Sequence, residues 1–166
     1  KLLPWWVRIL LKLILSRLSV SYAFWKKIGL FRHGKMDNEI YAIDVFNRHV
    51  KYAQIHENLK GLHILELGPG DNLSTGLISH AHGAGCTLVD VDNFAKFTEK
   101  NYKKLQTKLN SDLGINLNLN FTNEKSFLDK VNCSYYTEGM VSLKEIGNNS
   151  IDFIFSQAVL EHVKKI

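Results

Sequence analysis

The chain has 166 residues and a formal net charge of +5; 45% of its residues are hydrophobic and 22% are charged. This length allows one sizeable core, and the composition is that of an ordinary soluble protein. The two cysteines have no metal-ligand spacing and lie in apolar, strand-like segments, so no zinc or disulfide framework is indicated. We therefore expect Cys86 and Cys133 to be core thiols in a reducing compartment.

The positive charge is concentrated at the N-terminus. Residues 1–35 contain eight Lys or Arg and no acidic residue, whereas residues 61–166 contain ten basic and twelve acidic residues. This asymmetry favours contact between the N-terminal region and something anionic.

Residues 1–18 have the pattern of an amphipathic helix. Pro4 suits a first helical turn, and Arg8 and Lys12 recur on one face, while the remaining surface is Trp, Ile and Leu. The charges within the apolar stretch argue against both a transmembrane helix and a signal peptide. Two interpretations remain. The helix either packs on the domain or a second subunit, or lies on an anionic membrane surface, with residues 1–30 as the contact.

The region that follows is predicted to be helical with one polar interruption. A short helix is expected over residues 21–31, a polar turn over 32–37 and a longer helix over 38–59, where apolar residues recur at helical spacing. We assign residues 1–60 to a basic amphipathic helical extension, or cap. Three histidines of this region are expected to be surface or half-buried polar residues rather than ligands: His33, His49 and His56.

A βαβ nucleotide-binding unit is predicted next in the chain. An apolar strand over residues 62–67 enters the turn Gly68-Pro69-Gly70, a helix follows over 73–82, and a second strand over 86–92 ends in carboxylates. Glycine has no Cβ, so the backbone of such a turn can approach a ligand, and the amides at the helix N-terminus point toward it. Leu73 stands where a dinucleotide-binding Gly-x-Gly-x-x-Gly motif requires glycine, which argues against an NAD-dependent dehydrogenase.

Acidic residues accompany both strands of this unit. Asp92 comes twenty-two residues after Gly70, where a carboxylate can accept both hydroxyls of a ribose. Asp90 is the nearby competitor, and strand alternation places it on the same face, one pleat earlier. Asp71 is interpreted as a helix N-cap rather than a ligand. Glu66 comes two residues before Gly68, within the first strand.

The remaining elements follow at plausible distances. Ser156 and Gln157 come at the carboxyl end of the fourth strand, where open α/β sheets bind their ligands. A helix is expected from Ala158, and it carries Glu161 and His162. The other expected elements are a crossover helix over 94–109, a short strand or extended loop over 115–120, a helix over 126–131, a third strand over 133–138 and a fourth strand over 151–155.

Three segments resemble motifs of the class I S-adenosylmethionine (SAM)-dependent methyltransferases: Glu66-Leu67-Gly68-Pro69-Gly70, the acidic end of the second strand, and Leu160-Glu161-His162. The resemblance covers roughly residues 60–166. It implies an α/β fold with the Rossmann-like sheet of that family, in which strands one to four are present and later strands are missing. By this resemblance residues 61–166 form a truncated SAM-binding domain, and this piece alone is expected to be inactive.

The resemblance also implies roles for individual residues. Glu66 would lie near the methionine end of SAM, and Asp92 would bind the ribose. In the family, an acid followed by a small residue often comes after the third strand. Here Gly139-Met140-Val141 stands at that place, so apolar packing of Met140 on the adenine is expected instead. Glu161 and His162 are candidates for substrate binding or acid–base catalysis, with a structural role as the alternative. The complete cofactor-binding set is Glu66, Gly68, Pro69, Gly70, Asp92, Met140 and Ser156, and no metal site is expected.

The expected activity is methylation of an oxygen on a small-molecule, lipid or glycan acceptor. The Asn/Asp-Pro-Pro-Tyr motif of amino-methylating enzymes is absent after the fourth strand, and the basic arm has an apolar rather than a polar face, so nucleic acid is disfavoured. The alternative is a non-catalytic protein that binds a membrane or a partner and uses the fold as a scaffold. The expected location is the cytoplasm, including the inner face of the membrane.

Overall fold

A computed structural model describes residues 4, 6–7, 9–10, 38–55 and 58–157, and the chain divides into two compact units, residues 1–34 and 35–166. In the first unit the described residues Trp6, Val7, Ile9 and Leu10 are helical, as the sequence predicts. The short helix and the polar turn predicted over 21–37, with His33 and His56, lie outside the described residues. In the described part of the chain, no helix has the length and apolar character that crossing a membrane requires.

The second unit is built on a parallel sheet of four strands in the order β3-β2-β1-β4. The chain moves from β1 to β2 to β3 in one direction and then returns past β1 to add β4 on the other side. The connectivity therefore reverses between β1 and β4, and open α/β sheets bind ligands at such a point, beyond the carboxyl ends of the strands. The strands are β1 (His63–Leu67), β2 (Gly85–Val89), β3 (Cys133–Tyr136) and β4 (Phe153–Ser156).

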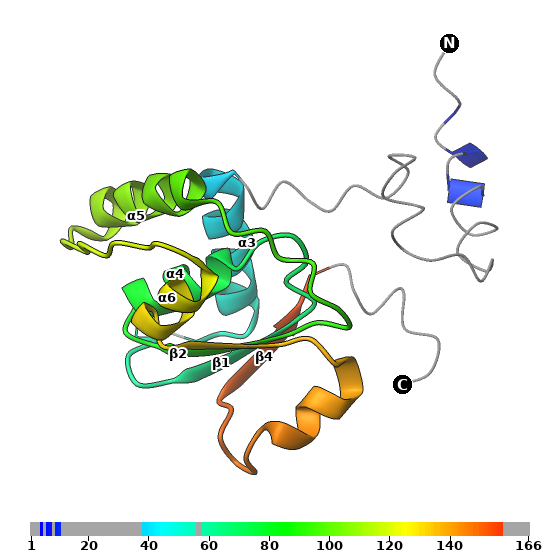
Figure 1. Cartoon of the computed structure of the whole chain (residues 1–166). Helices are drawn as coiled ribbons and strands as arrows, with labels where there is room; N and C mark the ends of the chain where they lie inside the picture. The colour runs from blue at the N-terminus through cyan, green and yellow to red at the C-terminus, as the bar shows by residue number, and fades with distance from the viewer. Residues whose placement is uncertain (1–3, 5, 8, 11–37, 56–57, 158–166) are drawn as a thin grey trace. The chain divides into compact units, whose positions relative to one another are not determined.

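Four α-helices cover one face of the sheet, and a 3-10 helix lies on the other side (Figure 1). The central strands β1 and β2 are rich in buried residues, most of them apolar, as the middle strands of a parallel sheet usually are. The helices are α3 (Glu39–Tyr52), α4 (Ser74–Ala81), α5 (Glu99–Leu113), α6 (Glu124–Lys130) and the 3-10 helix η1 (Gly139–Glu145).

The core between the helices and the sheet is rich in aromatic rings. Tyr102 of α5 packs against Phe127 of α6, with ring centroids 4.2 Å apart, and Phe127 packs edge-on against Phe121. Ala42 and Phe46 of α3 belong to the same core and are almost completely buried. Helix α3 is therefore part of the compact unit that contains the sheet, although the sequence analysis places residues 1–60 in an extension.

Several element boundaries differ from those predicted. Helix α3 begins after its N-cap Asn38, as expected, but it ends at Tyr52 rather than near residue 59, because Gln54 has a left-handed φ of 54°. Helix α5 begins at Glu99 rather than at residue 94, and it ends only at Leu113, where Gly114 is left-handed. The short helix η1 follows β3, and no sequence pattern predicted it.

The alternating segment 115–120 is an extended loop, which was one of its two predicted conformations. Side chains of α5 satisfy its backbone: Asn110 bonds both the N–H and the C=O of Leu117, and Gln106 accepts from the N–H of Leu119. Because the helix supplies these hydrogen bonds, the segment packs on α5 without joining the sheet.

Both cysteines are free thiols. Cys86 is buried, and Cys133 lies opposite it in the β2–β3 register. A Cβ added to Gly76 of α4 would come within 3.0 Å of the Cys133 sulfur, so the helix packs directly on the strands here. The prediction that these residues belong to the core is confirmed for Cys86, and Cys133 is half-buried at the edge of the core.

Candidate functional site

The turn after β1 has the backbone geometry that its glycines allow. Gly68 and Gly70 have φ values of 75° and 70°, a region that residues with a Cβ rarely adopt. Two hydrogen bonds attach this turn to the end of β2: Gly68 N–H donates to the Val89 carbonyl at 2.8 Å, and Gly70 N–H donates to Asp90 Oδ2 at 3.0 Å. The turn is therefore held at the carboxyl edge of the sheet, which is the end where the carboxyl ends of the parallel strands lie.

Asp90 connects the glycine turn with the ends of β2 and β3. It is only 8% exposed, and its Oδ1 accepts from the Val91 N–H at 2.8 Å. Its own N–H donates to the Tyr136 carbonyl, and its carbonyl accepts from the Gly139 N–H. These contacts fix one carboxylate at the carboxyl edge, beside the backbone of the turn.

Asp92 has a different environment from the one predicted. Strand β2 ends at Val89 rather than at residue 92. The Asp90 N–H makes the last backbone hydrogen bond to β3, and the Asp90 side chain accepts from the N–H of Val91. The strand alternation expected between Asp90 and Asp92 therefore does not occur. Asp92 is exposed, and its Oδ1 accepts from the Asn93 N–H at 2.7 Å.

Glu66 is a buried carboxyl group near the turn. It is 1% exposed, and burial is the main cause that raises its pKa from 4.5 to about 7. A hydrogen bond with the Thr75 side chain opposes this rise, whereas the nearby charge of Asp90 adds to it. Among the described residues, Glu66 Oε2 has no hydrogen-bond partner. A buried carboxylate oxygen of this kind can accept from a ligand.

The start of α4 is held by a tyrosine instead of by a side-chain cap. Asp71 was predicted to be the N-cap, but the N-cap is Leu73, which has no side chain suited to the role. The Leu73 N–H donates instead to the buried Tyr102 hydroxyl of α5 at 3.1 Å. Lys96 N–H also donates to the Asp71 carbonyl at 3.0 Å, so the loop after β2 braces the turn.

Replacing Tyr102 with phenylalanine should lower the free energy of unfolding by about 1–2 kcal/mol. The change removes one hydroxyl and leaves the Leu73 N–H buried without its acceptor, and buried unsatisfied donors cost about this much. Urea denaturation monitored by circular dichroism measures the change. Tyr52→Phe is the matched control, because Tyr52 is 78% exposed and its replacement should have no measurable effect. Equal stability of the Tyr102 variant and the natural protein would exclude this role.

An apolar surface adjoins Asp90 at the ends of β2 and β3. Val91, Met140 and Val141 are exposed by 72%, 77% and 54%, and a Cβ on Gly139 would lie 3.3 Å from Val91 Cγ1. Met140 therefore lies at the edge where the sequence analysis placed it, although its contact with an adenine remains a prediction.

The carboxyl end of β4 lies next to that of β1. Ser156 pairs with Leu67, and its Oγ is buried without a hydrogen-bond partner among the described residues. The next residue, Gln157, bonds His49 of α3: Oε1 lies 3.0 Å from Nε2. The His49 ring also stacks on Phe155, with centroids 4.7 Å apart. His49 is half-buried, as the sequence analysis expected, but its contact with Gln157 was not predicted, because no local pattern connects residues 108 positions apart.

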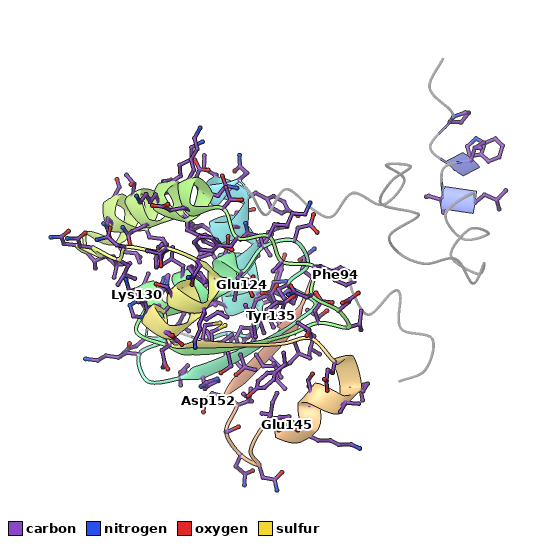
Figure 2. All side chains as sticks on the ribbon, viewed as in Figure 1. Phe94, Glu124, Lys130, Tyr135, Glu145 and Asp152 are labelled. Atoms are coloured by element: carbon purple, nitrogen blue, oxygen red, sulfur yellow. The ribbon has the colours of Figure 1, made fainter. Side chains whose placement is uncertain are left out.

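Five of the predicted residues lie at the carboxyl ends of β1 and β4, close to Asp90 in the fold, and Met140 follows the carboxyl end of β3. Figure 2 shows Phe94 and Asp152 at opposite ends of the strands. Asp152 joins β4 to the start of β1, where its Oδ2 accepts from the His63 N–H at 2.8 Å. Glu161 and His162 lie outside the described residues. Within residues 38–55 and 58–157, and in the described part of the N-terminal arm, no cluster of three or more His, Cys, Asp or Glu could hold a metal ion. The five residues at the ends of β1 and β4 are Glu66, Gly68, Pro69, Gly70 and Ser156.

Comparison of the chain with protein-family models, with curated proteins and with solved structures finds no match. The sheet order and the geometry of this edge are therefore the basis for a functional proposal.

Proposed function

We propose that this protein binds S-adenosylmethionine at the carboxyl edge of β1 and β2 and transfers its methyl group to an oxygen of a small-molecule, lipid or glycan acceptor. The observation that carries the proposal is the buried Glu66 carboxylate, whose Oε2 has no partner among the described residues, beside a left-handed glycine turn. SAM carries an ammonium group and a sulfonium, and a desolvated carboxylate attracts such cations.

The sheet order supports one orientation of the cofactor. Ribose and adenine belong over β2 and β3, where the Asp90 carboxylate and the apolar surface of Val91 and Met140 lie. The methionine part then lies over β1, next to Glu66 and the glycine turn. In this orientation the methyl group is directed toward β4, at the point where the connectivity of the sheet reverses.

We assign the ribose-binding role to Asp90 in preference to Asp92. Asp90 is fixed beside the glycine turn, because its two carboxylate oxygens accept from the Gly70 and Val91 N–H groups. Asp90 also adjoins the glycine turn, whereas Asp92 lies three residues beyond the end of β2 and is exposed. A preorganised carboxylate loses less entropy on binding.

Methyl transfer requires few catalytic groups from the protein. The acceptor oxygen must approach the sulfonium carbon in line, and holding the two reactants in that geometry supplies much of the rate enhancement. Such a reaction is compatible with a site that consists mainly of groups for binding the cofactor.

Titration calorimetry of S-adenosylhomocysteine into the complete protein tests the proposal. We expect one site with a dissociation constant in the micromolar range, and no heat with NAD, because Leu73 replaces the third glycine of a dinucleotide site. A folded protein that fails to bind S-adenosylhomocysteine would refute the enzyme assignment and leave a non-catalytic scaffold as the better explanation.

A further inference from the structure

A histidine of helix α3 reaches the same edge of the sheet from outside the nucleotide-binding unit. His49 is half-buried, stacks on Phe155 and bonds Gln157. Gln157 Oε1 lies 3.0 Å from His49 Nε2, and the imidazole tautomer with its hydrogen on Nε2 satisfies this pair. The Nδ1 atom of this tautomer then has a lone pair and accepts hydrogen bonds.

The position of Gln157 places this imidazole near the reversal point of the sheet. Leu67 and Ser156 are the last paired residues of β1 and β4, so Gly68 and Gln157 leave the sheet side by side. Neighbouring strands are separated by about 4.8 Å, so the Gln157 backbone adjoins the glycine turn. His49 is bonded to the side chain of this residue and therefore lies at the β4 side of the sheet, close to its carboxyl end.

We propose that His49, held by Gln157, faces the transferable methyl group and forms the acceptor side of the site. This inference rests on the proposed SAM binding, in which ribose and adenine lie over β2 and β3 and the methyl group is directed toward β4. The acceptor must then enter between the cofactor and α3.

A hydroxyl acceptor fits the His49 tautomer that carries its hydrogen on Nε2. A lone pair on Nδ1 receives the hydrogen of a hydroxyl, whereas it offers nothing to an acceptor that lacks a donor group. In the reaction the hydroxyl oxygen forms the new bond to the methyl carbon and the carbon–sulfur bond breaks with its electrons on sulfur. The hydroxyl proton passes to the imidazole, and S-adenosylhomocysteine leaves as a neutral thioether.

The charged groups around His49 come from three elements. On α3 itself Asp44 and Arg48 form an ion pair with each other, and Lys51 is exposed. From β1, Glu66 is the strand partner of Phe155, on which His49 stacks, and His82, the C-cap of α4, packs against Phe46.

A charge placed at position 49 tests this geometry, because SAM and S-adenosylhomocysteine differ only by a methyl group and its positive charge. His49→Lys should weaken SAM binding about three- to tenfold relative to S-adenosylhomocysteine, since two cations a few ångströms apart repel in a partly desolvated site. His49→Glu should change the ratio of the two dissociation constants in the opposite direction. Titration calorimetry on the complete protein measures both ligands.

Two controls make the result specific. His49→Gln is neutral and should leave the ratio unchanged. Ile40→Lys adds the same charge as His49→Lys, but it lies nine residues earlier on the opposite side of α3 and is 61% exposed, so it should also leave the ratio unchanged. If the lysine variant does not fold, the glutamate variant gives the same test with the opposite sign.

The possible results separate the two proposals. An unchanged ratio in charge variants that bind both ligands overturns the role of His49 and leaves SAM binding intact. Failure of the natural protein to bind either ligand overturns the proposed function, and the inference with it.

Discussion

Asp90→Ala should weaken S-adenosylhomocysteine binding at least tenfold, whereas Asp92→Ala should change it by less than about twofold. A hydrogen bond to a charged group contributes about 1.5–3 kcal/mol, and the Asp90 carboxylate is placed to receive two from the ribose. The same carboxylate holds the Gly70 and Val91 amides, so its loss also releases the turn. Titration calorimetry of both variants, with circular dichroism to verify folding, measures the difference.

The conservative variant Asp90→Asn separates binding from structure. Asparagine keeps one oxygen to accept from the Gly70 N–H but loses the charge and one acceptor. The Val91 N–H then faces an amide NH2 group, so we expect the free energy of unfolding to fall by about 1–2 kcal/mol, in a protein that still folds and binds at least fivefold more weakly. A larger loss of affinity from Asp92→Ala than from Asp90→Ala would instead assign ribose binding to Asp92, as the spacing in the sequence predicts. It would leave the proposal of SAM binding unchanged.

Glu66→Gln should make the ligand-free protein more stable at pH 8 and less able to bind its cofactor. The free energy of unfolding should increase by about 3 kcal/mol, because the variant has no buried charge, while an amide of the same shape can keep a hydrogen bond with Thr75. Cofactor binding should weaken severalfold, since the carboxylate no longer attracts the ammonium group. Urea denaturation at two pH values and calorimetry measure the two effects.

The direction of the pH dependence follows from the raised pKa. The folded state holds the Glu66 proton up to about pH 7, whereas the unfolded chain releases it near pH 4.5. Between these values the folded state binds more protons, so this contribution to stability is complete below pH 4.5 and is lost as the pH rises through 7. The natural protein should therefore lose stability across this window relative to the variant.

A constant difference between Glu66→Gln and the natural protein from pH 4 to pH 8 would contradict this account, because it would show that Glu66 does not titrate in the window. Glu145→Gln is the matched control. That side chain is exposed on η1, and its replacement should leave the pH profile unchanged.

The nucleotide-binding unit was predictable because its signals are local. The apolar run of β1, the paired glycines and the apolar run of β2 each lie within a few residues, and the structure has strands and a turn at these places. The boundaries were less predictable. Strand β2 ends three residues early because Asp90 engages both β3 and the turn, and the sequence near residue 90 contains no sign of those partners.

The caps show the same limit. Asp71 has a typical capping side chain at a plausible position, yet the start of α4 is held by the hydroxyl of Tyr102, 29 residues away from Leu73. The periodicity of residues 94–109 predicted a helix, but the part before Glu99 forms the loop that bonds back to Asp71. In both cases a long-range hydrogen bond outweighs a local propensity.

By itself the sequence determined the elements: a parallel α/β unit with a glycine turn between two buried strands, and a basic, apolar arm before it. Periodicity and glycine placement are enough for that, because both act over a few residues. Only the tertiary structure decided which acid adjoins the turn, how deeply Glu66 is buried and that His49 reaches the end of β4. These properties depend on contacts between segments up to 108 residues apart, which register and packing bring together and local sequence does not encode.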